Sequence, residues 1–402
     1  MNSSVHDIKG SSAGTYDRVL LFGMMLLLAF GALMIYSSTS VVTPLSAKKN
    51  ITEFYYFKRH LLTMALGCLA MLCTYSIKPS TLKKLSVPLL VCSFVLLGLV
   101  FVPHIGVTAG GARRWIRLWP TTFQPSELVK LAMVIFLARY MSMPGYRTES
   151  FGSFVKPLLV MAAFQAVFLK QPDFGSTMSL AFLTFAMLFI SGMRLRYIAS
   201  VLVLAIPVVY KLAMEPYRLR RITSFLDPWK DPLGSGFQLV QSFISLGSGG
   251  LTGLGLGESK QKLSFLPASH TDFIFCLVGE ELGLIGASVL IALFVFLFVR
   301  GIRIACRAQD KFVAYLAYGL TLMISVQALI NFAVVTGLVP TKGLPLPFMS
   351  YGGSALLVNM AAVGILLKIS KGECEKAAAE DDSVKARRIA RRNIYSRKGY
   401  GQ

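Results

Sequence analysis

The residue best placed for chemistry is an aspartate at the point where a polar loop meets a hydrophobic run. Asp272 lies in the stretch LPASHTDFIFCLVGEE, residues 266–281, and apolar residues follow it directly. A carboxylate at the mouth of a hydrophobic segment is costly unless water or a partner compensates it, so such acids are candidates for function. An acid before an apolar run also fits a helix N-cap, and both roles of Asp272 stay open.

A second set of charges lies near the start of another apolar run. Glu127 and Lys130 are three residues apart and therefore share one face of a helix. They either neutralise each other as a structural ion pair or leave Lys130 to hold an anion. Asp173, Asp272 and Lys342 fall at the ends of other runs on the same inferred side. One polar cavity outside the membrane would hold all five side chains.

The composition indicates what must position these side chains. Hydrophobic residues make up 54% of the 402 residues and charged residues 15%, which is typical of a polytopic membrane protein. Apolar runs long enough to cross about 30 Å of hydrocarbon predict an all-α protein of about ten transmembrane helices. These runs lie at residues 18–40, 60–77, 86–103, 128–142, 155–171, 174–192, 195–213, 273–299, 312–337 and 347–367.

An even number of spans places both chain ends on one side of the membrane. Lys and Arg are in excess on that side, mostly through the tail, which favours a cytoplasmic location for both termini. We expect a cytoplasmic N-terminal segment at 1–17, a membrane domain at 18–370 and a basic cytoplasmic tail at 371–402. A large periplasmic loop at 214–271 separates spans seven and eight. The first run lacks a small-residue cleavage site, so we expect a retained span.

The net charge of +22 does not indicate a nucleic-acid partner, because the basic residues are spread over many short loops. Only the tail carries a dense basic cluster, which fits contact with anionic lipid headgroups or, alternatively, partner docking. The six cysteines show neither metal-ligand nor disulfide spacing. GLGLG, residues 253–257, follows no strand, so we interpret it as a surface bend and expect no organic cofactor.

Three segments on the inferred outer side contain charged residues or residues that interrupt regular helix. GARRWI, which includes Arg114, fits either an interfacial belt or a cavity wall. The loop at 214–271 is expected to fold as a cap with an interfacial helix after Phe237. The prolines and glycines of PTKGLPLPFMSYGGS, residues 340–354, predict non-helical backbone at the entrance of the last span. Such backbone is tolerated at membrane depth where it lines a cavity. Gln327 and Asn331 are spaced to bond to neighbouring helices.

Six motifs together resemble the SEDS family of bacterial membrane proteins (shape, elongation, division and sporulation). They are GARRWI, QPSELVK, QPDFGS, DPLGSGFQ, LPASHTDFIF with GEELG, and PTKGLPLPFMSYGGS, in the family's order from about residue 16 to 368. The segment GLGLGESKQKLSFLP is most similar to the cell-division branch. The resemblance implies a peptidoglycan glycosyltransferase that polymerises lipid II in the bacterial cytoplasmic (inner) membrane at the division septum.

The resemblance also implies roles for individual residues. Asp272 would be the catalytic aspartate, and the substrate-binding residues would be Lys130, Glu127, Arg114, Asp173, Arg59, His270, Lys342 and Ser350. A divalent cation, Mg²⁺ or Mn²⁺, is expected, with Asp272 and Glu127 as candidate ligands. The implied partners are lipid II, the undecaprenyl-pyrophosphate-linked glycan, a class B penicillin-binding protein and other membrane proteins of the divisome.

The residues and the resemblance together suggest a mechanism. Transfer from an α-linked donor to a β-linked product requires inversion, which a single displacement provides with Asp272 as general base on the acceptor 4-hydroxyl. Arg114 and Lys130 would stabilise the departing pyrophosphate. Burial raises the pKa of Asp272 and a nearby cation lowers it, and the sequence leaves that balance open. A lipid II flippase and a non-catalytic septal scaffold are the alternatives, although the chain shows no convincing internal repeat of the kind transporters have.

Overall fold

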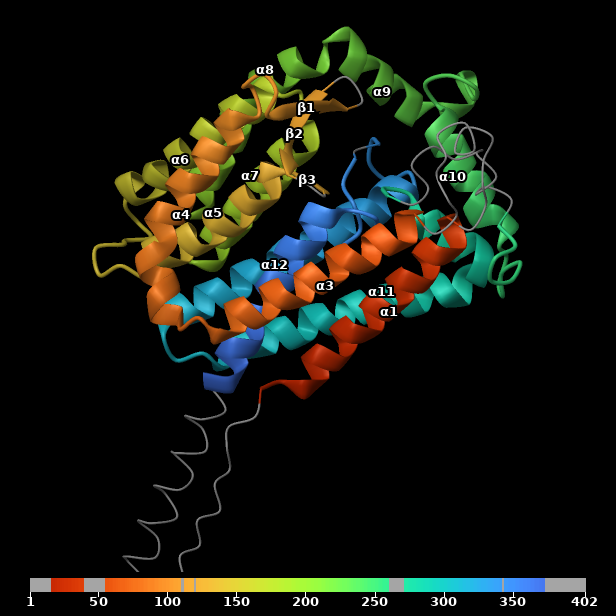
Figure 1. Cartoon of the computed structure of the whole chain (residues 1–402). Coiled ribbons are helices and arrows are strands. Elements are labelled where there is room, and N and C mark those ends of the chain that lie inside the picture. The colour runs from red at the N-terminus through yellow and green to blue at the C-terminus, as the bar shows by residue number, and fades with distance from the viewer. Residues whose placement is uncertain are drawn as a thin grey trace, which may run out of the picture.

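The computed structural model describes residues 16–39, 55–109, 112–118, 121–259, 271–341 and 343–372. Ten helices of at least 17 residues run through this part of the chain (Figure 1). They are α1 (Arg18–Thr39), α3 (Tyr55–Ser76), α4 (Pro79–Leu99), α5 (Pro125–Met141), α6 (Phe151–Lys170), α7 (Phe174–Ile190), α8 (Leu195–Ala213), α11 (Ile274–Arg307), α12 (Lys311–Val335) and the last helix, Gly353–Gly372. Each coincides with an expected span, so the expectation of a mainly helical membrane protein is confirmed.

Six of these helices are long and apolar enough to cross a membrane: α1, α4, α6, α11, α12 and the last helix. The chain is therefore a multi-pass membrane protein. α7 is a shorter apolar helix, and α5 has only 17 residues, among them Glu127, Lys130 and Arg139. Large apolar side chains such as Leu204 of α8, 74% exposed, are placed to contact lipid. The exact count of ten spans stays a prediction.

The two ends of the described chain meet at one end of the bundle. The Asp17 carboxylate accepts a hydrogen bond from Arg300 Nη2 at 2.7 Å, and the Asp17 backbone N–H donates to Ser370 Oγ at 3.0 Å. These contacts join the start of α1 to α11 and to the last helix. We call this the terminal end of the bundle, and the opposite end, where α9 and α10 lie in Figure 1, the loop end.

Helix α12 packs against α5, α7 and α11 and forms the centre of the bundle. Its Leu316 and Leu320 are fully buried, and a side chain on Gly319 would collide with Val134 of α5 and Met187 of α7. Close backbone approach at a glycine is typical of helix contacts in membranes. α12 therefore provides a rigid support for residues at the loop end.

A small antiparallel sheet at the loop end is an addition to the expected all-α architecture. Its strands, in the order β1-β2-β3, are β1 (Gly106–Ala109), β2 (Ala112–Leu118) and β3 (Thr121–Phe123). Val107 pairs with Trp115, and Ile116 pairs with Phe123. β2 buries Ala112 and Ile116, and its pairing with β1 shifts register between Val107 and Thr108. Residues 112–116 of the GARRWI segment are therefore part of a strand, and an interfacial position for them stays a prediction.

The described part of the segment between α8 and α11, residues 214–259 and 271–273, is folded, as expected. It contains α9 (Pro216–Leu226), the 3-10 helix η1 (Pro228–Lys230) and α10 (Phe237–Ser248). α10 begins where the sequence predicts a helix, and it buries Leu239 and Val240 while packing against α11. The interfacial position of α10 stays a prediction.

The glycine-rich segment after α10 turns against α11. The Leu254 N–H donates to the Glu280 carbonyl at 3.0 Å. Gly253 and Gly255 have φ values of 85° and 109°, a left-handed region that favours glycine. α11 itself bends at Gly283, where φ is 63°. GLGLG is therefore a bend, as expected.

Candidate functional site

Asp272 lies at the loop end, in the turn that precedes α11. The helix begins at Ile274, its N-cap residue is Phe273, and no side chain makes a capping hydrogen bond there. The capping interpretation of Asp272 is therefore wrong, which leaves its carboxylate for another role.

The backbone of Asp272 is held by α12. Asn331 Nδ2 donates to the carbonyl oxygens of Asp272 and Leu344, each at 2.8 Å. A side chain on Gly343 would lie 3.0 Å from Asp272 Oδ2, so the carboxylate lies against this glycine. One buried amide thus fixes the Asp272 turn to the segment 343–345.

The surroundings of Asp272 make its carboxylate a stronger base than an exposed one. Burial raises the pKa of Asp272 to about 6, while the charges of Arg221 and Arg114 lower it. Burial outweighs the two cations, which answers the question that the sequence left open. A pKa near 6 keeps the carboxylate mostly ionised at neutral pH and still able to accept a proton.

A cavity of about 250 Å³ opens beside Asp272. Its polar wall consists mainly of three arginines, Arg114 of β2 and Arg218 and Arg221 of α9. Gly343 lines the cavity and also contacts the Asp272 carboxylate, so the acid lies at the edge of the cavity. The site therefore combines a base with a cationic wall.

The start of α7 orients Arg114. Arg114 Nη2 donates to the Pro172 carbonyl, and Nη1 lies 3.9 Å from Asp173 Oδ1. Asp173 is 4% exposed and caps α7, because it accepts from the N–H and the hydroxyl of Ser176 at 3.2 and 2.7 Å. Both Arg114 and Asp173 line the cavity, and the contacts of Asp173 are those of a residue that holds Arg114 in place.

No motif in the sequence assigned Arg218 and Arg221 to the site. They are three residues apart on α9 and share the helix face that lines the cavity. Arg221 Nη1 donates to the Thr341 carbonyl at 3.1 Å, and Arg218 Cζ lies 5.2 Å from the centre of the Phe174 ring. The RLRR run was the available signal, but only the fold places α9 over the cavity.

Glu127 and Lys130 form a buried ion pair. Their Oε1 and Nζ atoms are 2.9 Å apart, and each residue is 2% exposed. Lys130 also donates to Gln327 Oε1 at 2.8 Å, and Gln327 Nε2 donates to the Pro345 carbonyl at 2.9 Å. Neither charged residue lines the cavity. The geometry favours the structural interpretation, in which the pair braces the segment that includes Pro345.

The remaining candidates lie away from the cavity wall or outside the described residues. Arg59, on α3, donates to a tyrosine hydroxyl one turn earlier at 3.1 Å. Ser350 is 3% exposed, and its Oγ accepts a backbone N–H four residues earlier at 2.8 Å, so it closes a turn. His270 and Lys342 fall outside the described residues. The cavity therefore contains only part of the expected constellation.

The described residues do not form a metal site. They contain no group of three His, Cys, Asp or Glu side chains placed to hold an ion. Of the two candidate ligands, Glu127 is paired with Lys130, and Asp272 lies near the charges of two arginines. The expected divalent cation stays a prediction, and no step proposed below depends on it.

Residues 17–375 match the model of a family of cell cycle proteins that groups FtsW, RodA and SpoVE. The chain belongs to this family. Among FtsW/RodA/SpoVE relatives, the probable peptidoglycan glycosyltransferase FtsW of Geobacter metallireducens is 46% identical over 88% of this chain and 94% of that protein. The protein of the same name from Coxiella burnetii is 42% identical over 90% and 98%. Stage V sporulation protein E of Bacillus subtilis is 40% identical over 88% and 97%.

Solved structures share the fold of this FtsW/RodA/SpoVE chain. One chain comes from a structure described as "Structural coordination of polymerization and crosslinking by a peptidoglycan synthase complex". It is 28% identical, with a TM-score of 0.74 over 89% of this chain and 98% of that one. The rod shape determining protein RodA of Thermus thermophilus is 26% identical, with a TM-score of 0.65 over 88% and 96%. The family assignment from the six sequence motifs is confirmed.

Proposed function

We propose that this chain is a peptidoglycan glycosyltransferase of the FtsW type that polymerises lipid II into glycan strands. Its relatives carry that enzyme name. The observation that carries the proposal is the Asp272 carboxylate at the edge of an arginine-lined cavity. Sugar transfer from a pyrophosphate carrier needs a base for the acceptor and cations for the leaving group.

Asp272 acts as the general base in the proposed reaction. It accepts the proton of the acceptor 4-hydroxyl while that oxygen forms a bond to the anomeric carbon of the growing glycan. The bond from this carbon to undecaprenyl pyrophosphate breaks in the same step, so an α-linked donor gives a β-linked product without a covalent enzyme intermediate. A pKa of about 6 suits this role, because the base is ionised at neutral pH.

The three arginines stabilise the departing pyrophosphate. Arg114, Arg218 and Arg221 place guanidinium groups around the cavity, where negative charge develops as the carrier leaves. Guanidinium groups suit phosphate oxygens because they offer paired donors in a fixed plane. Contacts with the start of α7 orient Arg114, so little reorganisation of this side chain is needed to bind the pyrophosphate.

Residues behind the cavity wall position the reactive turn. Asn331 holds Asp272, and Lys130 acts through Gln327 on the segment 343–345. These contacts support our proposal that Lys130 and Glu127 position the site, whereas the resemblance implies direct substrate contact. A displacement of about 1 Å in a catalytic group can cost on the order of 10²-fold in rate. Substrate contacts by Arg59, His270, Lys342 and Ser350 stay predictions.

The proposed setting is the division septum of the inner membrane. The termini would lie in the cytoplasm and the arginine-lined cavity on the periplasmic side. We infer a class B penicillin-binding protein as the crosslinking partner, because a similar chain belongs to a complex that coordinates polymerization and crosslinking. Other divisome membrane proteins would join them. Mg²⁺ or Mn²⁺ remains an expectation from the resemblance, and neither proton transfer to Asp272 nor pyrophosphate departure depends on it here.

The test is glycan-strand formation from labelled lipid II by the purified protein, alone and with its cognate transpeptidase. Asp272→Asn should form no strands, whereas wild type should. The control is Asp227→Asn, which changes an exposed acid between α8 and α11 and should also form strands. Strands from all three proteins would refute Asp272 as the base.

The alternatives give different results in the same series. Lipid II flipping in vesicles without any strand formation would support the flippase. Absence of both activities, with partner recruitment that survives Asp272→Asn, would support the scaffold.

A further inference from the structure

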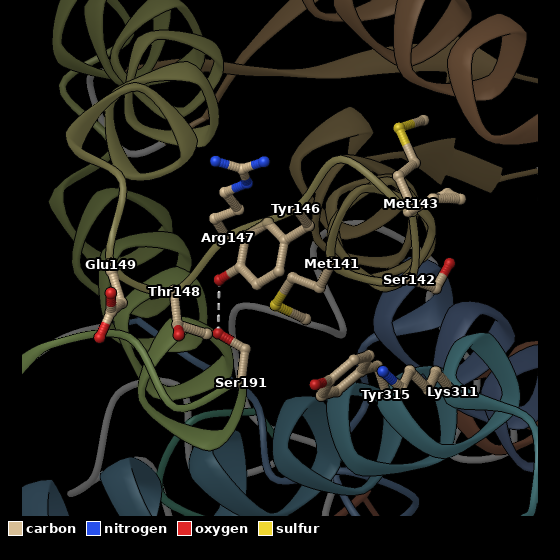
Figure 2. Close-up of a pocket in the computed structure, with 11 residues that line it drawn as sticks. Met141, Ser142, Met143, Tyr146, Arg147, Thr148, Glu149, Ser191, Lys311 and Tyr315 are labelled. Atoms are coloured by element: carbon tan, nitrogen blue, oxygen red, sulfur yellow. Dashed lines mark hydrogen bonds between the residues drawn. The ribbon is translucent and has the colours of Figure 1, made fainter.

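A second cavity, of about 680 Å³, lies at the terminal end of the bundle. It forms where α5 ends at Met141 and α12 begins at Lys311, and the connection between α5 and α6 covers one side. Asp272 precedes α11 at the loop end, so this cavity is separate from the proposed active site. Figure 2 shows the side chains that line it.

The charged side chains give this cavity a positive wall. Arg147 and Lys311 line it, both are exposed, and neither forms an ion pair within the part of the chain that the structure describes. Glu149 also lines it, but its carboxylate is paired with Arg194. Asp310, next to Lys311, caps α12 by accepting the Val313 N–H at 3.0 Å. Two cations therefore remain for a ligand.

One wall of the cavity is fixed by a relay of hydroxyl groups. Tyr146 and Ser191 place their oxygens 2.6 Å apart. The Ser191 hydroxyl donates to the Leu188 carbonyl at 2.7 Å, so the Tyr146 hydroxyl is the donor to Ser191. This relay ties the connection after α5 to the end of α7 and gives the cavity a fixed shape.

Further hydrogen-bond donors line the same cavity. Figure 2 shows Arg147 and Lys311 on different sides of the cavity, with the Tyr315 hydroxyl directed toward the Ser191 side. Tyr315 and Thr148 line the cavity, and their hydroxyl groups make no hydrogen bond to other described residues. Guanidinium, ammonium and hydroxyl donors together match the oxygens of a phosphate group.

The depth of the cavity in the membrane indicates where the phosphate comes from. Lys311 is the first residue of α12, and Arg147 lies between α5 and α6; α6 and α12 are both long and apolar enough to span. Ends of membrane-spanning helices lie at headgroup depth, and basic pockets between helices at that depth bind anionic headgroups.

We propose that this cavity is a binding site for an anionic phosphate group, supplied by the headgroup of a phospholipid in the leaflet at the terminal end. Arg147 and Lys311 bind its oxygens from two sides, and the Tyr315 hydroxyl donates a further hydrogen bond. A soluble phosphate ester has the same chemistry, and the experiment below separates the two sources. The site plays no part in the reaction at Asp272, so it stands or falls independently of the proposed enzyme function.

The test is native mass spectrometry of the purified full chain with phosphatidylglycerol, with phosphatidylcholine as the zwitterionic probe and inorganic phosphate as the soluble one. Arg147→Gln/Lys311→Gln should bind phosphatidylglycerol at least about fivefold more weakly than wild type. The control Lys78→Gln/Lys84→Gln removes the same charge from exposed lysines that flank the start of α4, and it should bind as wild type does. Tyr315→Phe keeps the charge and should weaken binding by roughly two- to fivefold.

Several results would overturn the proposal. Equal weakening in the cavity variant and the control would show that binding follows net charge and not the cavity. Equal retention of phosphatidylcholine would show that anionic charge is not selected. Displacement of phosphatidylglycerol by inorganic phosphate in wild type, but not in the cavity variant, would keep the phosphate site and reject the lipid as its source.

Discussion

Asn331 Nδ2 donates to the backbone carbonyls of Asp272 and Leu344, each at 2.8 Å. The proposed base is therefore positioned from α12, the central helix, and not by the helix that follows it in sequence. Leu344 adjoins Gly343, which forms the cavity wall against the Asp272 carboxylate. A single amide thus sets the distance between the base and the wall of the arginine-lined cavity.

Asn331→Leu keeps the size of the side chain and removes its donors. We expect a fall in kcat of roughly 10- to 100-fold with little change in KM, because the base is misplaced while the arginine wall remains. Asn359→Leu is the matched control, since the side-chain polar atoms of this buried asparagine have no hydrogen-bond partner among the described residues. Steady-state kinetics of strand formation measure both, and similar losses in the two variants would contradict a positioning role for Asn331.

Arg218 and Arg221 should contribute to binding and to departure of the pyrophosphate. Arg218→Gln and Arg221→Gln are each expected to lower kcat/KM by roughly tenfold, because each removes a charge-assisted donor. Arg220→Gln removes the same charge from an exposed residue that does not line the cavity and should have little effect. If Arg220→Gln were as impaired as the other two, the effect would come from the charge of the loop and not from the cavity.

The Glu127–Lys130 pair should behave as a buried structural ion pair. Glu127→Gln leaves the Lys130 ammonium without its partner and should destabilise the protein by about 3–5 kcal/mol. Glu127→Gln/Lys130→Met removes both charges and should recover much of the lost stability. Thermal unfolding in detergent measures the difference. A double variant that is as unstable as Glu127→Gln would contradict the structural ion pair.

Asp272 should reduce stability at neutral pH. Its pKa in the folded protein is raised from 3.8 to about 6, so the folded state holds this proton more tightly than the unfolded state. The tighter proton binding by the folded state adds to the free energy of unfolding below about pH 4, and this contribution is lost as pH rises through about 6. Asp272→Asn should therefore raise the Tm at neutral pH by an amount equivalent to about 1–3 kcal/mol, and less at about pH 4. A Tm difference that is independent of pH would contradict the raised pKa.

The sequence predicts the helices well because long apolar runs in a membrane have few alternatives to a helix. Each of the ten long helices coincides with an expected run, and the folded segment with a helix after Phe237 is present. Asp272 was singled out by its place between a polar loop and an apolar run. The Glu127–Lys130 ion pair was also predictable, because three-residue spacing on one helix brings the charges together.

Other features depend on contacts between distant segments, which local pattern does not contain. The pairing of Val107 with Trp115 requires a sheet whose strands are too short to stand out in the sequence. Arg218 and Arg221 belong to the site only because α9 folds back over the cavity. The capping interpretation of Asp272 failed because α11 begins two residues later, with Phe273 at the N-cap.

The pH dependence of strand formation tests most directly that Asp272 is the base. If Asp272 is the base, kcat/KM for wild type should rise with pH through a single ionisation near 6 and then level off. Arg221→Gln removes a cation that lowers the pKa of Asp272, so its inflection should move to higher pH. A wild-type rate that does not change between about pH 5 and pH 8 would contradict the assignment of Asp272 as the base.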